Sequence, residues 1–323
     1  MDKPNKFQWE KYGQIFSLSD WNSQSSAKSQ AQNPYALVLE DRVRVYFNTR
    51  TNKDSLGQSK SFPAYVDFDR ADLSTVINCS LEPLLEWGGI GDFDEFGIMS
   101  GSVYQIEDRL LMYYVGWSRM VSVPYNWSIG VAESLDGGDS FKKSFRGPII
   151  SNTEREPFLQ AGCSSLLKRG DTYYLWYTSG LDWLKGESKP ESMYQIMCAK
   201  SKDGLNWERD AKVLINPKLS DEAQASPTVF EKDGIYHMFF SYRHSLDFRN
   251  RERGYRIGYA YSQDLVTWER NDELAGITTS DNGWDSEMVC YPHLKVIDDD
   301  FYLFYCGNNF GQDGFGLAKM IID

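Results

Sequence analysis

Carboxylates recur at comparable positions along this chain, beside glycine or proline and just ahead of segments with β character. They lie in FDEFGIM (93–99), TEREPFLQA (153–161), SDEAQA (220–225) and GWDSEMV (283–289). Paired carboxylates cleave glycosidic bonds, because one protonates the leaving oxygen while the other attacks the anomeric carbon or activates water. The predicted catalytic residues are Asp94, Glu156, Glu222, Asp285 and Glu287. For each acid taken singly, the competing interpretation is a solvated loop charge or a turn cap.

A second set of residues lies at or near the ends of strand-like segments and has the chemistry of sugar recognition. Tryptophan faces stack on sugar rings, and arginine or asparagine binds hydroxyl and carboxylate groups. The predicted substrate-binding residues are Arg50, Trp117, Trp183, Arg243, His293 and Asn308. Arg243 opens the arginine-rich run RHSLDFRNRERGYR (243–256), which suits a phosphate or an anionic sugar. Packing inside the fold is the alternative role for each tryptophan, and a solvated loop is the alternative for the run.

Composition excludes several other classes of function. The 323 residues carry a net charge of −12, which disfavours nucleic acid as a partner. No apolar run is long enough for a membrane span, and residues 1–16 lack the apolar core of a secretion signal. Five scattered cysteines favour reduced thiols, so we expect a cytoplasmic protein. Neither a metal site nor a cofactor is predicted, because HExxH, Cys/His clusters and glycine-rich phosphate loops are missing from the sequence.

The elements that would position these residues repeat along the chain. Aromatic strand-like segments align at Phe47, Tyr114, Tyr177, Phe240 and Tyr305, at intervals of 67, 63, 63 and 65 residues. Each follows a charged or glycine-containing turn, which is typical of a β-hairpin. Three repeats then add another strand, a Ser-x-Asp turn and an aromatic anchor, in 129–141, 196–207 and 257–268. We expect these turns to be structural, with the aspartate capping the turn and the aromatic ring packing between repeats.

Five such units predict an all-β fold, a five-bladed β-propeller with four antiparallel strands per blade, in one domain over residues 1–323. The last repeat ends after its third strand. Residues 7–16 are therefore predicted to supply the missing outer strand and to close the ring, which removes an open sheet edge. The alternative is a two-domain β-sandwich with coincidental spacing.

From about residue 30 onward the chain resembles the five-bladed propellers of the glycosidase superfamily that includes invertases, levansucrases, arabinanases and β-mannoside phosphorylases. It is more similar to a branch found among polysaccharide and lipopolysaccharide biosynthesis genes. The motifs that carry the resemblance are FDEFGIMSGSV (93–103), YYVGW (113–117), IGVAESLDGG (129–138), YRIGYAYSQD (255–264), GWDSEMVCYP (283–292) and GNNFGQDGFGLA (307–318). The resemblance implies a five-bladed propeller with a carbohydrate in its axial funnel.

The chain also departs from the enzymes of that superfamily. Gln32-Asn33-Pro34 stands where invertase-type enzymes carry their Asn-Asp-Pro nucleophile, and Glu156-Pro157 matches the general-acid position only loosely. We therefore predict a glycoside hydrolase-like enzyme that acts on a glycan or sugar conjugate in polysaccharide metabolism. Two alternatives stay open, a non-catalytic sugar-binding or scaffold propeller and a phosphate-dependent glycoside phosphorylase. The sequence does not indicate an oligomeric state.

Overall fold

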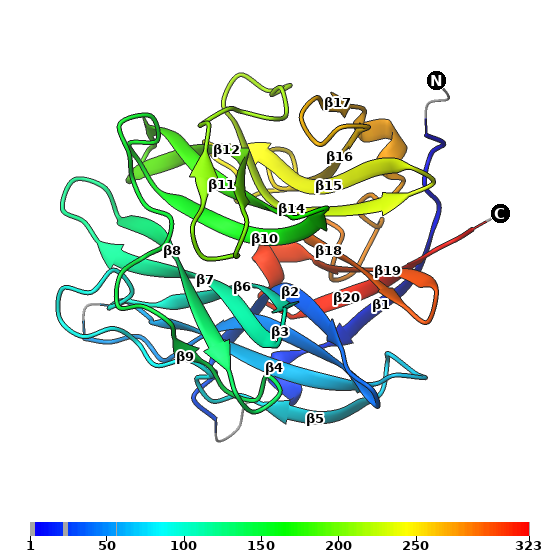
Figure 1. The fold of residues 1–323 in the computed structure, drawn as a ribbon, viewed down its shortest axis with the longest axis horizontal. Coiled ribbons are helices and arrows are strands. Elements are labelled where there is room, and N and C mark those ends of the chain that lie inside the picture. Colours follow the sequence, from blue (N-terminus) through cyan, green and yellow to red (C-terminus); the bar gives the residue numbers. More distant parts are fainter. Residues whose placement is uncertain (1–3, 22–24, 56, 323) are drawn as a thin grey trace.

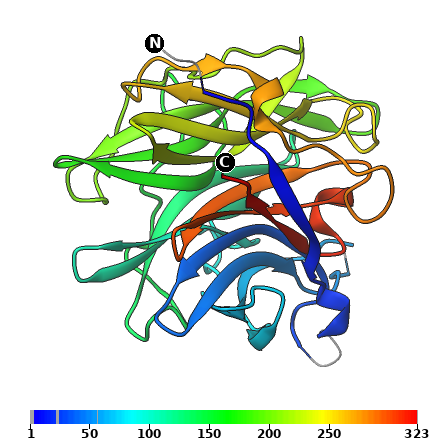
Figure 2. The same cartoon turned by 90° about the vertical axis from the view of Figure 1, so that its right-hand side faces the viewer.

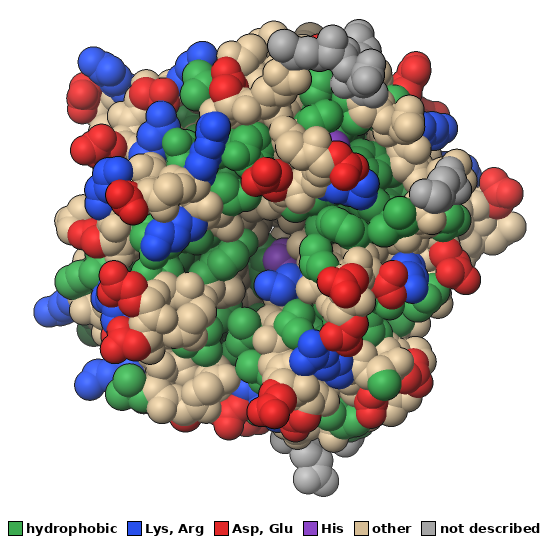
Figure 3. Space-filling model, turned by 45° about the vertical axis from the view of Figure 1, so that its right-hand side comes forward, with side chains coloured by type: hydrophobic (Ala, Val, Ile, Leu, Met, Phe, Trp, Pro, Cys, Tyr) green, Lys and Arg blue, Asp and Glu red, His purple; other side chains and the backbone are tan. Residues whose placement is uncertain are grey.

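The computed structural model describes residues 4–21, 25–55 and 57–322. Over these residues the chain forms five antiparallel sheets of four strands each, arranged as blades around a central axis (Figure 1). The predicted five-bladed β-propeller is therefore confirmed. Figure 3 shows that one face of the ring is hollowed near its middle, where hydrophobic side chains, a histidine and a basic side chain gather.

Consecutive segments of the chain form consecutive blades. Blade one contains β2 (Ser29–Val38), β3 (Arg42–Arg50), β4 (Ser61–Asp69) and β5 (Val76–Ser80). Blade two contains β6 (Ile98–Ile106), β7 (Arg109–Arg119), β8 (Tyr125–Ser134) and β9 (Lys142–Lys143). Blade three contains β10 (Gln160–Arg169), β11 (Thr172–Lys185), β12 (Pro190–Ser201) and β13 (Glu208–Arg209).

The last two blades follow the same order from the axis outward. Blade four contains β14 (Glu222–Lys232), β15 (Ile235–His244), β16 (Arg256–Ser262) and β17 (Glu269–Arg270). Blade five contains β18 (Cys290–Ile297), β19 (Asp300–Cys306), β20 (Phe315–Met320) and β1 (Trp9–Phe16). Short helical turns span η1 (Leu18–Asp20), η2 (Asp272–Ala275) and α1 (Asn308–Gly311). Among the described residues, no helix has the length and apolar character to cross a bilayer.

The N-terminal strand closes the ring, as the sequence predicts. β1 pairs antiparallel with β20, and the ladder runs from Trp9 opposite Met320 to Phe16 opposite Phe315. Figure 2 shows the first and last strands of the chain side by side in this blade. The Phe16 ring stacks on Phe315, with ring centroids 5.3 Å apart. Pairing the first and last strands leaves no open edge between the first and last blades.

Every innermost strand is interrupted by a bulge at the same level. The ladders to the second strands shift register in all five blades, between Gln32 and Tyr35, Ser100 and Val103, Ala161 and Ser165, Ala225 and Thr228, and Cys290 and His293. At four of these bulges the backbone enters the left-handed region, at Asn33, Gly162, Ser226 and Tyr291. A non-glycine residue is strained there, and such strain gathers at functional sites.

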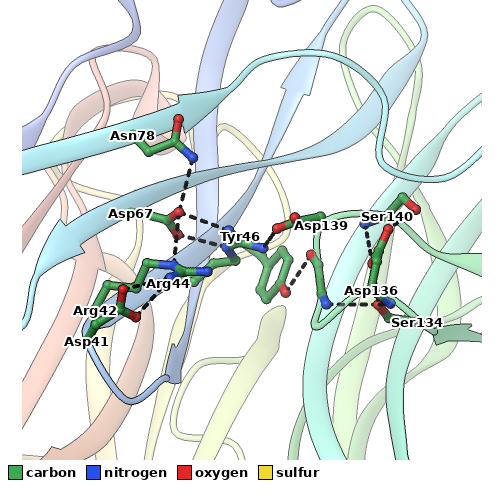
Figure 4. A network of polar contacts seen from close by, with 11 residues as sticks. Asp41, Arg42, Arg44, Tyr46, Asp67, Asn78, Ser134, Asp136, Asp139 and Ser140 are labelled. Carbon is green, nitrogen blue, oxygen red and sulfur yellow. Dashed lines mark hydrogen bonds and ion pairs between the residues drawn. The ribbon is translucent and has the colours of Figure 1, made fainter.

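The Ser-x-Asp turns of blades two and three dock onto the preceding blade. In blade two, Ser134 donates to Asp136 at 2.7 Å, while the Tyr46 hydroxyl of blade one donates to the Gly138 carbonyl at 2.9 Å (Figure 4). The Tyr113 hydroxyl of blade two makes the equivalent bond at 2.8 Å to Gly204 of blade three. Hydrogen bonds lower the pKa of Asp136 to about 2 against the effect of its burial. The geometry of these turns is thus that of structural turns. The carboxylate of each aspartate accepts a hydrogen bond from the serine of the same turn.

Aromatic residues fill the space between and within the blades. The aligned second-strand rings are all fully buried, namely Phe47, Tyr114, Tyr177, Phe240 and Tyr305. Anchors after the Ser-x-Asp turns pack against the neighbouring blade, as Trp207 does on Tyr113 with ring centroids 5.8 Å apart. The aromatic share of 15% therefore serves mainly the core, and only a minority of these rings is free to contact a ligand.

Candidate functional site

A cavity of about 620 Å³ lies at the axis, on the side where the innermost strands begin. The bulge residues Asn33, Gly162, Ser226 and Tyr291 all line it. The Ser226 hydroxyl donates to the Asn33 side-chain carbonyl at 3.3 Å, which links the innermost strands of blades four and one. We call this cavity the axial pocket. Its volume matches that of a small-molecule site.

One wall of the axial pocket is an aromatic cluster carried by the β7–β8 hairpin. Tyr125 and Trp127 stack almost in parallel, with centroids 4.3 Å apart and 6° between the planes, and Trp117 packs 5.1 Å from Trp127. All three rings line the pocket. The indole nitrogens of Trp117 and Trp127 are buried and have no hydrogen-bond partner in the structure. Flat apolar rings with unused donors are suited to a sugar.

Basic residues dominate the charged lining of this pocket. Its basic members are Arg50, Lys53, Arg119, Lys189, Arg243 and Arg249, whereas Glu191 is the one carboxylate among the described lining residues. The whole chain carries −12. The pocket lining is therefore positively charged, against the net charge of the molecule. Such a concave positive field raises the local concentration of anions.

Arg243 is the most buried of these basic residues, with 5% of its surface exposed. Its guanidinium lies 3.5 Å from the centroid of the Phe248 ring. It donates to the Tyr194 hydroxyl at 2.8 Å and to the His244 carbonyl at 2.7 Å, while its Nε has no partner. The side chain is thus held rigidly by stacking and hydrogen bonds, and its charge is not neutralised by a carboxylate.

Glu191, at the start of β12, forms an ion pair with a neighbouring arginine. Its carboxylate accepts a hydrogen bond from the Arg249 guanidinium at 2.8 Å. Arg249 in turn lies over the Phe248 ring, 4.2 Å from its centroid. The pocket therefore offers one carboxylate, already engaged in an ion pair.

Four of the five predicted catalytic carboxylates lie outside the axial pocket, in buried ion pairs that repeat from blade to blade. In blades two, three and five the acid accepts a hydrogen bond from the aligned tyrosine and pairs with a base on the outermost strand. The three sets are Tyr114–Asp94–Lys143, Tyr177–Glu156–Arg209 and Tyr305–Asp285–Lys11. We call these sets the blade clamps. They tie the segment before the innermost strand to the second and fourth strands of the same blade.

Blade four has a variant of the clamp. Phe240 replaces the tyrosine, and Glu222 instead accepts hydrogen bonds from Gln224 at 2.6 Å and from Arg270 at 2.6 Å.

Burial and the nearby carboxylate raise the pKa of the clamp tyrosines, Tyr114 among them, well above the usual value. These phenols consequently stay protonated and act as hydrogen-bond donors to the acids.

The fifth predicted catalytic residue and three predicted binding residues also lie outside the pocket lining. Glu287 is exposed, and its backbone N–H donates to the Asn308 side chain at 2.7 Å. His293 is buried on β18, with its ring centroid 5.5 Å from that of Tyr35. Trp183 packs against the aromatic wall, with its ring centroid 5.2 Å from that of Tyr125. Asn308 and Trp183 thus support residues near the pocket.

Three of the six predicted binding residues line the axial pocket, namely Arg50, Trp117 and Arg243. Among the lining residues not predicted as site residues are Tyr125, Tyr194 and Glu191. A hairpin register would have revealed Tyr125, because Trp127 pairs with Trp117 across β7 and β8 and Tyr125 lies two residues before Trp127, on the same face. Nothing comparable in the sequence marks Glu191.

Comparison with known proteins places the chain in a family. It is 35% identical over 317 residues to the uncharacterized proteins MT1551 and Rv1502 of Mycobacterium tuberculosis, strains CDC 1551 / Oshkosh and ATCC 25618 / H37Rv, covering 97% of this chain and 99% of each relative. The chain belongs to the same family as these two proteins. No family model matches it.

Solved structures with the same fold are glycoside hydrolases and related proteins. One glycoside hydrolase has a TM-score of 0.73 at 16% identity, covering 98% of this chain and 92% of the other. A thermostable family-43 glycoside hydrolase has a TM-score of 0.60 at 17% identity, covering 93% and 91%. A member of the GH130 family of mannoside phosphorylases has a TM-score of 0.65 at 14% identity, covering 99% and 95%. The chain therefore has a glycoside hydrolase-like propeller fold.

Proposed function

We propose that this protein binds a glycan or sugar conjugate in its axial pocket and does not hydrolyse it through a pair of carboxylates. The observation that carries the proposal is the composition of the lining. It combines the aromatic wall of Trp117, Tyr125 and Trp127 with amide and hydroxyl groups, and Glu191 is its one carboxylate among the described residues. Stacking surfaces with polar groups between them are what a sugar ligand requires.

Hydrolysis needs two carboxylates on opposite sides of the bond to be cleaved, separated by about 5 to 10 Å. The acids of the blade clamps are buried outside the pocket lining and each is paired with a base; in Asp285, Oδ2 accepts from both Tyr305 and Lys11. An acid held in this way is not available to a substrate in the pocket. Glu191 lacks a second acid in the described lining to work with.

A binding measurement tests the first half of the proposal. The Trp127→Ala variant should bind oligosaccharides on a glycan array about fivefold more weakly than the parent, because an aromatic platform contributes about 1 kcal/mol. The matched control is Trp21→Ala, since Trp21 is 45% exposed and lies outside the pocket. Equal loss in both variants, or no saccharide bound by the parent chain, would contradict sugar binding at this site.

A turnover assay tests the second half of the proposal, that the bound glycan is not hydrolysed. We expect no release of reducing sugar from the glycans that bind. Catalytic roles stay a prediction of the sequence for Asp94, Glu156, Glu222, Asp285 and Glu287. The same assay decides between that prediction and our proposal of binding without hydrolysis. Product release by the parent chain, abolished by Asp94→Asn or Glu222→Gln in folded protein, would establish hydrolysis and overturn our proposal.

A further inference from the structure

Arg243 differs from the other deeply buried arginines of the described chain in lacking a carboxylate partner. The others form ion pairs, Arg44 with Asp67, Arg209 with Glu156 and Arg270 with Glu222. Arg243 instead donates to the uncharged phenol of Tyr194 and to the His244 backbone carbonyl. A buried charge without a counter-charge costs several kcal/mol in real proteins. This fold maintains such a charge at a cavity wall, where a ligand can neutralise it.

The packing around Arg243 fixes the direction of its guanidinium. Phe248 stacks on it at 3.5 Å, and the centroids of Tyr194 and Tyr255 lie 5.3 and 5.2 Å away. The Tyr194 and Tyr255 hydroxyls are themselves bonded at 2.7 Å. A planar guanidinium held in one orientation is suited to bind an oxyanion through two parallel hydrogen bonds. Its Nε is buried and has no hydrogen-bond partner in the structure.

A second arginine in the same pocket is also unpaired. Arg50 ends β3 of blade one and lines the pocket, and its side chain makes no ion pair or hydrogen bond with any described residue. Burial lowers the pKa of Arg50, while the phenol of Tyr291 opposes that shift. Tyr291 also interacts electrostatically with Arg243. Tyr291 lines the pocket together with both arginines, and its ring centroid lies 5.3 Å from that of Tyr255, which is 5.2 Å from the Arg243 guanidinium.

We propose that Arg243 and Arg50 form an oxyanion subsite in the axial pocket, which binds a phosphate or carboxylate group carried by the sugar ligand. This inference rests on the proposed function and narrows it to acidic sugar conjugates. Lys53 and Lys189 belong to the same lining, are exposed, and have no ion-pair partner among the described residues. They extend the positive field outward, so that association with an anion should be fast and sensitive to salt.

Calorimetric titration of the full chain distinguishes a phosphate group from a carboxylate group as the charged part of the ligand. The probes are inorganic phosphate, glucose 1-phosphate, glucuronate and glucose, each at low and at high salt. We expect the charged probes to bind at least tenfold more tightly than glucose, with affinity falling as salt rises. Tighter binding of glucose 1-phosphate identifies a phosphate ligand, and tighter binding of glucuronate identifies a carboxylate ligand.

Two substitutions assign that binding to the arginines. Arg243→Gln and Arg50→Gln should each weaken binding of the charged probes at least tenfold. The control is Arg251→Gln, which makes the same change of charge at an exposed arginine outside the pocket lining. Arg50 is only partly buried, so its variant serves if Arg243→Gln does not fold. Charged probes that bind no more tightly than glucose, or variants that match the control, would overturn the subsite.

The outcomes also separate this inference from the proposed function. Saccharides that bind equally well with and without a charged group would leave sugar binding intact and remove the oxyanion subsite. Inorganic phosphate that binds through Arg243 and Arg50, together with failure of every saccharide on the array, would keep the subsite and remove sugar binding.

Discussion

At the scale of single residues, the same type of side chain has opposite roles according to its partners. Asp94 and Glu156 are carboxylates engaged by a phenol and a base, so they hold a blade together. Arg243 is a base with no acid beside it, so its charge is left for a ligand. Neither role follows from the residue type, because the free energy of a buried charge depends on what surrounds it.

His293 gives a prediction about pH. Burial, and secondarily the charge of Lys295, lower its pKa to about 3. An unfolded histidine titrates near pH 6.5, so the neutral ring stabilises the fold fully above that pH and progressively less as the pH falls toward 3. We expect His293→Gln to reduce the pH dependence of the unfolding free energy in this interval, where the parent slope from this residue reaches about 1.4 kcal/mol per pH unit.

Urea unfolding of the parent and of His293→Gln, at several pH values between 3 and 7, measures this difference. The two proteins should differ in slope below pH 6.5 and run parallel above it. Parallel curves over the whole range would show that His293 is not held neutral by the fold.

At the scale of elements, closure of the ring depends on close backbone approach between β1 and the start of β20. Gly314 has φ +114°, and a Cβ added there would lie 1.9 Å from the Phe16 carbonyl oxygen. Only glycine allows this contact, because any side chain would displace β1 from its partner. The blade clamp of Lys11 and Asp285 also holds β1, through a salt bridge of 2.8 Å.

Gly314→Ala should therefore destabilise the protein by more than about 2 kcal/mol, since it combines backbone strain with a steric clash. Gly283→Ala is the matched control, because Gly283 also has positive φ (+95°) but nothing lies within 4 Å of the added Cβ. Thermal unfolding followed by circular dichroism compares the two variants. An equal shift in melting temperature would mean that the contact with Phe16 does not limit closure.

At the scale of the whole molecule, the blades are joined by turns, shared aromatic packing and the closing strand. Arg44 of blade one binds Asp67 of its own blade at 2.7 Å and also reaches Asp139 in the turn of blade two (Figure 4). The ring geometry brings basic residues of several blades into one pocket, within a chain of net charge −12. An isolated blade would expose the faces that pack between blades. It would have neither these contacts between blades nor the shared basic pocket.

This interdependence predicts that residues 1–323 unfold as one unit, in line with the expected single domain. Differential scanning calorimetry should give one transition whose calorimetric and van't Hoff enthalpies agree. Tryptophan fluorescence and far-ultraviolet circular dichroism should report the same midpoint. Two separated transitions would instead indicate independent folding units and contradict this prediction.

The sequence alone determined the number of blades, the hairpins, the Ser-x-Asp turns and a closing strand within residues 7–16, which the structure places at Trp9–Phe16. These features depend on local periodicity and turn chemistry, which a linear pattern records. Recurrence also drew attention to Asp94 and Glu222, and their recurrence is explained in the structure by the blade clamps. The pattern is thus real, and it marks the acids that clamp blades two to five.

Only the tertiary structure decided which charged groups face the pocket. The bases that engage Asp94 and Glu222 come from outermost strands about 50 residues later, at Lys143 and Arg270. The pocket itself collects Glu191 and Arg243 from hairpins of different blades. A side chain's direction and its partner are set by packing between distant segments, and the free energy of a buried charge depends on that partner. For this reason the charged residues that line the axial pocket could be identified only from the folded structure.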